Sequence, residues 1–201
     1  MTAMDNGLTA FSANGSSNSW DEAPVLSAGQ IGLWVFLASI TMLFAGFTSA
    51  IFVRRTAADW QPMVAPGLLW LNTAFLLSSS ITIERVRGFV RLGRWQSARV
   101  WLLGTTLLGV LFLAGQIAVW RELVARGVYL SGNPHSAFFY ILTGAHAVHL
   151  AGGLAALAYL LARFRSASRN SASESSLKLC ATYWHFLDGL WIYLFVVLFV
   201  F

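Results

Sequence analysis

The sequence predicts an all-α membrane protein, a polytopic bundle of five transmembrane helices. Of its 201 residues, 57% are hydrophobic and only 10% are charged, which is typical of membrane proteins rather than of soluble domains. Five long stretches are almost free of charge, and each can supply the ~20 residues that a spanning helix needs. We therefore predict helices at about 29–53, 65–84, 100–121, 137–162 and 179–201.

Each helix is justified by where its uncharged stretch ends. The first and third stretches end at arginines, and the second ends at Glu84. The fourth stretch, 127–162, is longer than one span, and the Gly-Asn-Pro sequence that ends at Pro134 interrupts it. Its helix should therefore begin after that proline. The fifth stretch reaches the C-terminus and is interrupted by a single charged residue, Asp188.

Lysine and arginine are divided unevenly between the two ends of the predicted bundle. By the positive-inside rule, the richer end is cytoplasmic, which places the N-terminus in the cytoplasm and the C-terminus outside, in the periplasm. The rule also explains the net charge of +5 without a nucleic-acid partner. Nine basic residues lie at the cytoplasmic end and four at the other: Arg85, Arg87, Arg91, Arg94, Arg99, Arg163, Arg165, Arg169 and Lys178, against Arg54, Arg55, Arg121 and Arg126.

The chain divides into a short tail and one membrane domain. Residues 1–27 are rich in Ser, Asn and Gly and contain no Lys or Arg, so we expect a mobile cytoplasmic tail without a core. Residues 28–201 form the five-helix domain. The single cysteine, Cys180, cannot form an internal disulfide, and we assign it no role.

Ionisable residues within the predicted spans are the candidate site, because such groups are costly at membrane depth and need partners. His146 and His149 are three residues apart and share roughly one helix face, as do His185 and Asp188. Hydrogen bonding between helices, a metal or haem site, and a proton relay all remain open. Because their depths match, we expect Asp188 to accept a hydrogen bond from His149 or from a neighbouring tryptophan or histidine.

Other polar and aromatic residues have simpler interpretations. We expect Trp34, Trp70, Trp184 and Trp191 to pack inside the bundle, because they lie away from the helix ends. His135 follows Pro134 in an external loop, where we expect it to be solvated or bonded to the loop. No Walker loop, dinucleotide fingerprint, CxxC, HExxH or GxSxG motif is present in the sequence. The sequence therefore argues against a self-contained hydrolase, kinase or dehydrogenase site.

Two motifs carry a resemblance to a known family. They are Thr143-Gly-x-His146-x-x-His149 and, on the last helix, Tyr183-Trp-His-Phe-x-Asp188, supported by segments at 32–39, 71–79 and 108–116. Together they strongly resemble subunit III of the haem-copper terminal oxidases, in its bacterial five-helix form. The resemblance extends from about residue 32 to the C-terminus.

The resemblance implies a non-redox accessory subunit with no catalytic, cofactor or metal site of its own. Haems and copper are expected in the partner, the catalytic subunit I, whose sustained turnover and proton uptake this subunit supports. Bound phospholipid and a bacterial inner-membrane location are implied as well. The family motifs then define a structural polar cluster made of His146, His149, His185, Asp188, Trp184, Gln116 and Asn72.

The chain departs from the family at two places in the membrane. Glutamates are often found in the family where this sequence has Ile40 and Val119, so no role of those carboxylates transfers. The motifs do not report the electron donor, which leaves an accessory subunit of a quinol oxidase or nitric-oxide reductase as the alternative. From other classes, a b-type haem electron carrier using the three membrane histidines remains open, whereas a small transporter is disfavoured because no inverted repeat is evident.

Overall fold

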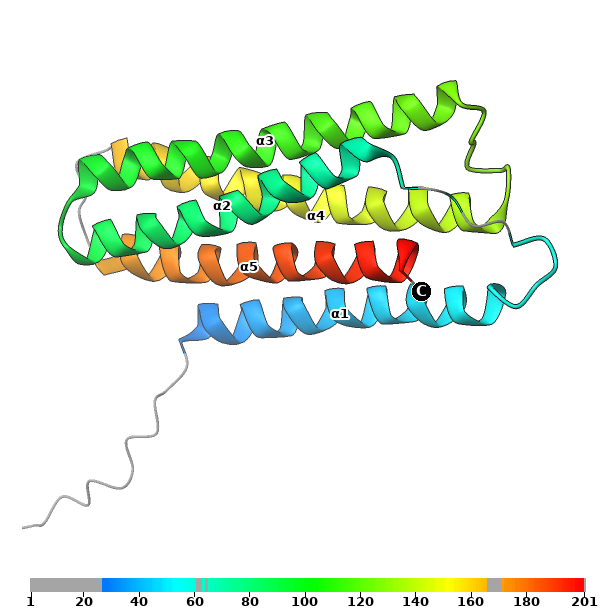
Figure 1. The fold of residues 1–201 in the computed structure, drawn as a ribbon. Helices are drawn as coiled ribbons and strands as arrows, with labels where there is room; N and C mark the ends of the chain where they lie inside the picture. The colour runs from blue at the N-terminus through cyan, green and yellow to red at the C-terminus, as the bar shows by residue number, and fades with distance from the viewer. Residues whose placement is uncertain (1–26, 61–62, 64, 166–170, 201) are drawn as a thin grey trace, which may run out of the picture.

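The computed structural model describes residues 27–60, 63, 65–165 and 171–200. Within them the chain forms five helices whose successive members run antiparallel (Figure 1). The predicted tail lies outside the described residues except for Ser27, which caps the first helix. The helices are α1 (Ala28–Arg54), α2 (Gly67–Arg91), α3 (Trp95–Ala125), α4 (Pro134–Arg165) and α5 (Ser171–Phe199).

Local sequence explains where several helices begin and end. Ser27 and Gln30 form a capping box at the start of α1, in which each side chain bonds the other residue's backbone N–H. The turn between α2 and α3 is only three residues long, because Gly93 adopts a φ of 68° that other residues rarely tolerate. Gly127, with a φ of 78°, follows α3 in the same way.

The helices extend beyond the predicted spans, which corrects two predicted connections. Most of the expected loop at 84–99 is helical, since α2 continues to Arg91 and α3 begins at Trp95. The predicted connection between 162 and 179 is helical up to Arg165 and again from Ser171 onward. Charged residues end a hydrophobic span but not a helix, because Arg and Glu are good helix formers in water.

Four of the helices are long and apolar enough to cross a membrane: α1, α3, and most of α4 and α5. The fifth, α2, does not reach the same apolarity, since it carries Asn, Thr and Ser residues in its middle and Glu84, Arg85 and Arg87 toward its end. In the described part of the chain, length and composition therefore support four spans, one fewer than predicted.

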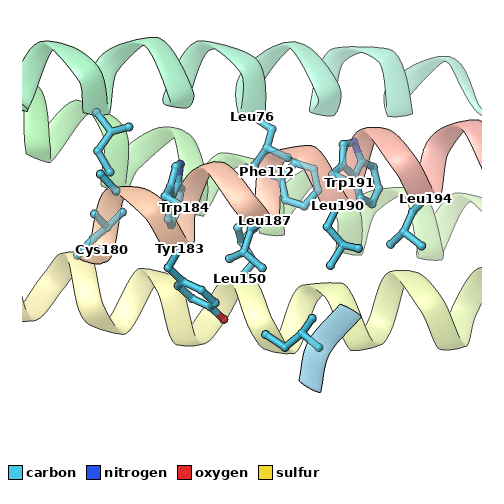
Figure 2. Packing of buried hydrophobic residues seen from close by; sticks show 14 of the residues in the cluster. Leu76, Phe112, Leu150, Cys180, Tyr183, Trp184, Leu187, Leu190, Trp191 and Leu194 are labelled. Atoms are coloured by element: carbon cyan, nitrogen blue, oxygen red, sulfur yellow. The ribbon is translucent and has the colours of Figure 1, made fainter. Parts of the chain in front are cut away.

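The last helix lies at the centre of the packing. α5 contacts α1, α2 and α4, while α2 packs most extensively on α3. Figure 2 shows Leu187, Leu190 and Trp191 of α5 among the residues of the buried cluster, together with Phe112 of α3 and Leu150 of α4. By contrast, α1 packs only against α4 and α5 and leaves much of its apolar surface exposed.

The four deep tryptophans behave in two ways. Trp184 and Trp191 are buried, as predicted, with 0% and 2% of their surface exposed. Trp34 and Trp70 are exposed, so the prediction that they pack inside the bundle was wrong. An apolar side chain gains little from burial when the surroundings are lipid, since the lipid tails are as apolar as the bundle core.

Trp184 fills a slot between two helices that is lined by glycine. A Cβ added to Gly109 of α3 would lie 2.8 Å from the Trp184 ring, and one added to Gly153 of α4 would lie 3.3 Å from it. The indole Nε1–H donates to the Ser79 hydroxyl of α2 at 2.9 Å. One side chain of α5 therefore joins three other helices, and small residues on α3 and α4 make the room.

Candidate functional site

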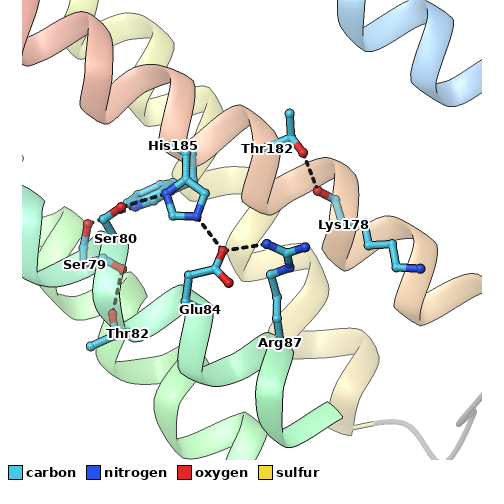
Figure 3. A network of polar contacts seen from close by, with 9 residues as sticks. Ser79, Ser80, Thr82, Glu84, Arg87, Lys178, Thr182 and His185 are labelled. Atoms are coloured by element: carbon cyan, nitrogen blue, oxygen red, sulfur yellow. Dashed lines mark hydrogen bonds and ion pairs between the residues drawn. The ribbon is translucent and has the colours of Figure 1, made fainter. Parts of the chain in front are cut away.

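A hydrogen-bonded network joins α2 to α5 near the arginine-rich end of the bundle (Figure 3). His185 Nε2 lies 2.8 Å from a Glu84 carboxylate oxygen, and its Nδ1 lies 2.7 Å from the Ser80 hydroxyl. The same Glu84 oxygen accepts a 2.6 Å bond from Arg87. A neutral His185 would donate to Glu84 from Nε2 and accept from Ser80 at Nδ1, so both ring nitrogens have partners.

Asp188, one turn further along α5, is buried but lacks the predicted partner. Only 4% of its surface is exposed, and neither carboxylate oxygen has a hydrogen bond of good geometry within the described residues. The Ser80 hydroxyl is close to the carboxylate but is aligned with His185 instead.

The predicted hydrogen bond from His149 to Asp188 was wrong. His149 donates from Nδ1 to the Ala145 carbonyl of its own helix at 2.7 Å, and its ring packs 5.9 Å from that of Phe44 on α1. Matching depth brings two residues to the same level, but the direction of each side chain around its helix decides whether they meet. Tyr183 makes the bond to this part of α4, since its hydroxyl donates to the His149 carbonyl at 2.9 Å.

His146 points into the aromatic core of the bundle. It is fully buried between Phe112 of α3, with ring centres 5.9 Å apart, and Trp191 of α5, with ring centres 5.2 Å apart. Neither of its nitrogens has a hydrogen-bond partner in the described part of the chain. Trp191 itself donates from Nε1 to the Thr73 hydroxyl of α2 at 3.0 Å.

Asn72 of α2 packs against α3, and Gln116 of α3 lies inside the bundle. Both are buried, and among the described residues their side-chain amides have no hydrogen-bond partner. Asn72 presses against α3 where Gly115 leaves room: a Cβ there would lie 2.0 Å from the Asn72 Oδ1. The seven predicted cluster residues are thus buried or half-buried in the bundle, but no side-chain hydrogen bond of the described residues joins any two of them.

The membrane histidines do not converge on a common ligand. His146 faces aromatic rings, His149 bonds its own helix, and His185 bonds Ser80 and Glu84. Among the described residues no three His, Cys, Asp or Glu side chains are arranged to hold a metal ion. A haem between two histidines needs their rings to face each other across a plane, so this geometry counts against the b-type carrier.

At the opposite end of the bundle, His135 joins the α1–α2 connection to the end of α5. Only 4% exposed, it accepts at Nδ1 from the Met63 N–H at 3.0 Å and donates from Nε2 to the Leu198 carbonyl at 2.9 Å. The expectation that His135 lies in the external loop was wrong, because it belongs to the first turn of α4. The solvated alternative is wrong as well, and the loop residue that it bonds, Met63, lies in the connection between α1 and α2. Burial by the end of α5 could not be read from the loop sequence.

Sequence reasoning missed the hydroxyl groups that receive these bonds. Ser79, Ser80 and Thr73 lie on the α2 side that faces α5, and they accept or share hydrogen bonds with Trp184, His185 and Trp191. The seven-residue step from Thr73 to Ser80 was the available signal, because two helical turns return to nearly the same face; Ser79 is the residue next to Ser80.

The two positions without glutamate lie inside the bundle. Ile40 of α1 is 3% exposed and Val119 of α3 is 0% exposed. Both aliphatic side chains belong to the hydrophobic core, so the structure places no ionisable group at either position.

The fold and this site define a class: a multi-pass α-helical membrane protein whose interior polar groups mainly connect its own helices. Its sequence relatives identify the family. The chain matches the family described as cytochrome c oxidase subunit III over residues 8–201. It therefore belongs to that family, and the resemblance seen in its motifs is confirmed.

Individual relatives agree over nearly their whole length. A protein of Nocardia farcinica named as a probable cytochrome c oxidase subunit 3 is 34% identical over 175 residues, which cover 85% of this chain and 86% of the relative. Cytochrome c oxidase subunit 3 of Alkalihalophilus pseudofirmus is 31% identical over 180 residues, covering 85% of each. The Synechocystis subunit 3 is 29% identical over 205 aligned positions, covering 99% of this chain and 86% of the relative.

Proposed function

We propose that this chain is a non-redox accessory subunit of a proton-pumping haem-copper oxidase in a bacterial cytoplasmic membrane. It docks on the catalytic subunit, stabilises it, supports its proton uptake and binds phospholipid. The observation that carries the proposal is the family match over residues 8–201. The hydrogen bonds of His135 and His185 support the non-redox part of the proposal. Both ring nitrogens of each histidine bond other groups of the protein and are therefore not free to bind a metal or haem.

We further propose that α2 is a fifth spanning helix. With 25 residues it is about 37 Å long, which exceeds the ~30 Å hydrocarbon core. Its polar side chains, such as Asn72, Ser79 and Ser80, are buried or half-buried against other helices, so they need not face lipid. These inward polar groups lower its average hydropathy without preventing it from crossing the membrane.

The arrangement supports an orientation with the N-terminus in the cytoplasm. Five antiparallel spans bring the α2–α3 turn, the end of α4 and the start of α5 to the same side as the start of α1, and eight of the basic residues that the structure describes lie at that end. A reporter enzyme that works only outside the cytoplasm should therefore be active when it is fused after residue 201. A reporter that works only in the cytoplasm should be inactive at the same position.

Purification of the assembled complex tests the main proposal. An affinity-tagged chain, extracted from native membranes in mild detergent, should bring a subunit with haem and copper absorbance and an oxygen-consuming activity. Cytochrome c and a quinol, offered separately as electron donors, distinguish a cytochrome c oxidase from a quinol oxidase. The proposal fails if the chain purifies alone as a monodisperse species while the oxidase is recovered elsewhere.

Loss of the chain tests its proposed role. An oxidase assembled without it should start at a normal rate and then lose activity or proton uptake during turnover, since the redox centres are expected in the partner. If the oxidase without the chain keeps its activity and proton uptake through many turnovers, the supporting role is wrong even though the family assignment stands.

A further inference from the structure

Two arginines and two aromatic rings alternate on the outer surface of the α2–α3 hairpin. The Arg85 guanidinium lies over the Trp101 ring, 5.7 Å from its centre. Trp101 stacks on Phe89, with ring centres 6.4 Å apart and planes 21° apart. The Arg94 guanidinium lies over Phe89 at 5.4 Å. We call these four residues the arginine ladder.

The two guanidinium groups of the ladder are held in place but keep their donors free. An aromatic ring attracts the cation through its face and leaves the N–H groups, which lie in the guanidinium plane, pointing outward. Within the described residues neither Arg85 nor Arg94 has an ion pair or a hydrogen bond from its side chain. Their neighbours differ: Arg87 is paired with Glu84, and Arg99 donates to the Phe164 carbonyl.

The local charge favours an anion. The hairpin segment 84–99 carries five arginines and a single acidic residue, Glu84, which is already bonded to Arg87 and His185. A fork of guanidinium N–H groups fits the oxygens of a phosphate better than a lysine ammonium does. The ladder therefore has the charge and the geometry of a phosphate site.

An exposed apolar strip continues from the ladder toward the middle of α2. Leu77 and Ile81 lie eight and four residues before Arg85 and are exposed. Helical spacing of three to four residues keeps such positions on one side of a helix. A ligand with a phosphate at the ladder and acyl chains along this strip would satisfy both surfaces.

We propose that the arginine ladder binds the headgroup phosphate of an anionic phospholipid, whose acyl chains lie along the exposed strip of α2. The proposal deepens the lipid binding named above and rests on the proposed function for its membrane setting. Basic residues next to a spanning helix attract anionic lipids, and the rings beneath Arg85 and Arg94 turn that general attraction into a defined site. A free phosphate ion would lack the contribution of the acyl chains.

The test uses the assembled oxidase and two photoactivatable lipids. The complex is reconstituted in vesicles that contain a trace of phosphatidylglycerol or of phosphatidylethanolamine with the reactive group on an acyl chain. Cross-linked peptides are then mapped by mass spectrometry. We expect phosphatidylglycerol to label the peptides of 77–107 several-fold more than phosphatidylethanolamine. Inorganic phosphate, added at constant ionic strength, should not reduce the labelling.

Matched variants separate the ladder from general surface charge. Arg85→Gln and Arg94→Gln should each lower labelling about tenfold, because each removes charge-assisted hydrogen bonds to the headgroup phosphate. Trp101→Leu keeps all charges but removes a ring, and labelling should again fall. Arg91→Gln is the control: Arg91 is exposed on the same hairpin, and none of the described rings lies beneath it, so labelling should change by no more than about twofold.

Four outcomes would overturn the proposal. The first three are equal labelling by the two lipids, an equal loss in Arg91→Gln and Arg85→Gln, and cross-linking of this hairpin to another subunit in place of lipid. The fourth is loss of lipid labelling when inorganic phosphate is added, which would mean that the ladder binds a simple anion and not a lipid headgroup. Co-purification of the haem-containing partner is scored in every sample, so failure of the lipid site is distinguishable from failure of the proposed function.

Discussion

Placing one methyl group at Gly109 should destabilise the bundle, because this glycine makes room for the tryptophan that joins four helices. A Cβ at Gly109 would lie 2.8 Å from the Trp184 ring and 2.5 Å from the tip of Leu154. The Leu154 side chain can change its rotamer. The Trp184 ring is fully buried and fixed by its bond to Ser79, so it can move only by breaking that bond or shifting α5.

The size of the effect follows from these contacts. Overpacking a well-packed core typically costs about 1–3 kcal/mol. Loss of the Trp184–Ser79 hydrogen bond falls within the ~0.6 to 1.7 kcal/mol measured for such bonds inside membranes. We therefore expect Gly109→Ala to lower stability by about 2 kcal/mol. A chain of this size would then lose roughly 4–8 °C in its midpoint of thermal unfolding.

The chain offers a matched control on the same helix. Nothing lies within 4 Å of a Cβ added to Gly104, so Gly104→Ala adds the same methyl group without a clash. It should be neutral or slightly stabilising, by up to about 1 kcal/mol, because alanine favours the helix. Gly153→Ala should fall between the two, since its Cβ would be 3.3 Å from the Trp184 ring.

The assay is thermal unfolding of the assembled oxidase in detergent, followed by size-exclusion chromatography of the fluorescently tagged subunit. A second substitution identifies the cause. In a Trp184→Phe background the smaller ring relieves the clash, so Gly109→Ala should cost clearly less there. Equal midpoints for Gly109→Ala and Gly104→Ala, or an undiminished loss in the Trp184→Phe background, would refute the reasoning.

Three further predictions follow from the buried polar and aliphatic positions. Gly115→Ala should reduce assembly strongly, because its Cβ would lie 2.0 Å from Asn72 Oδ1; Asn72→Ala should restore part of the loss, measured as subunit recovered per haem. Asp188→Asn should leave recovery unchanged, since no described donor bonds the carboxylate; a clear drop in recovery would mean that the charge has a partner. Ile40→Leu conserves an aliphatic core residue, so protons pumped per electron should stay the same, and a fall with intact assembly would contradict the view that this segment relays no protons.

The family and the helical architecture were accessible from sequence because both depend on short-range patterns. Long uncharged stretches predicted five helices near their observed positions, and the motifs around His146 and Asp188 identified the family. Helix ends were less accurate. The charges from Glu84 onward mark the end of the uncharged stretch, whereas the α2 helix itself continues to Arg91. A helix can continue past that point because its backbone hydrogen bonds are made within the helix, in water as in lipid.

What the sequence determined by itself is which residues are costly in a membrane and must therefore face inward; what only the tertiary structure decided is which partner each one meets. His149 and Asp188 match in depth, yet the rotation of α4 directs His149 to the Ala145 carbonyl, and α5 turns His185 toward Glu84. The same holds for the space around Trp184, which exists because glycines on two other helices coincide with it. Periodicity fixes the faces of one helix, but the rotation and offset between helices come from the packing of all five together.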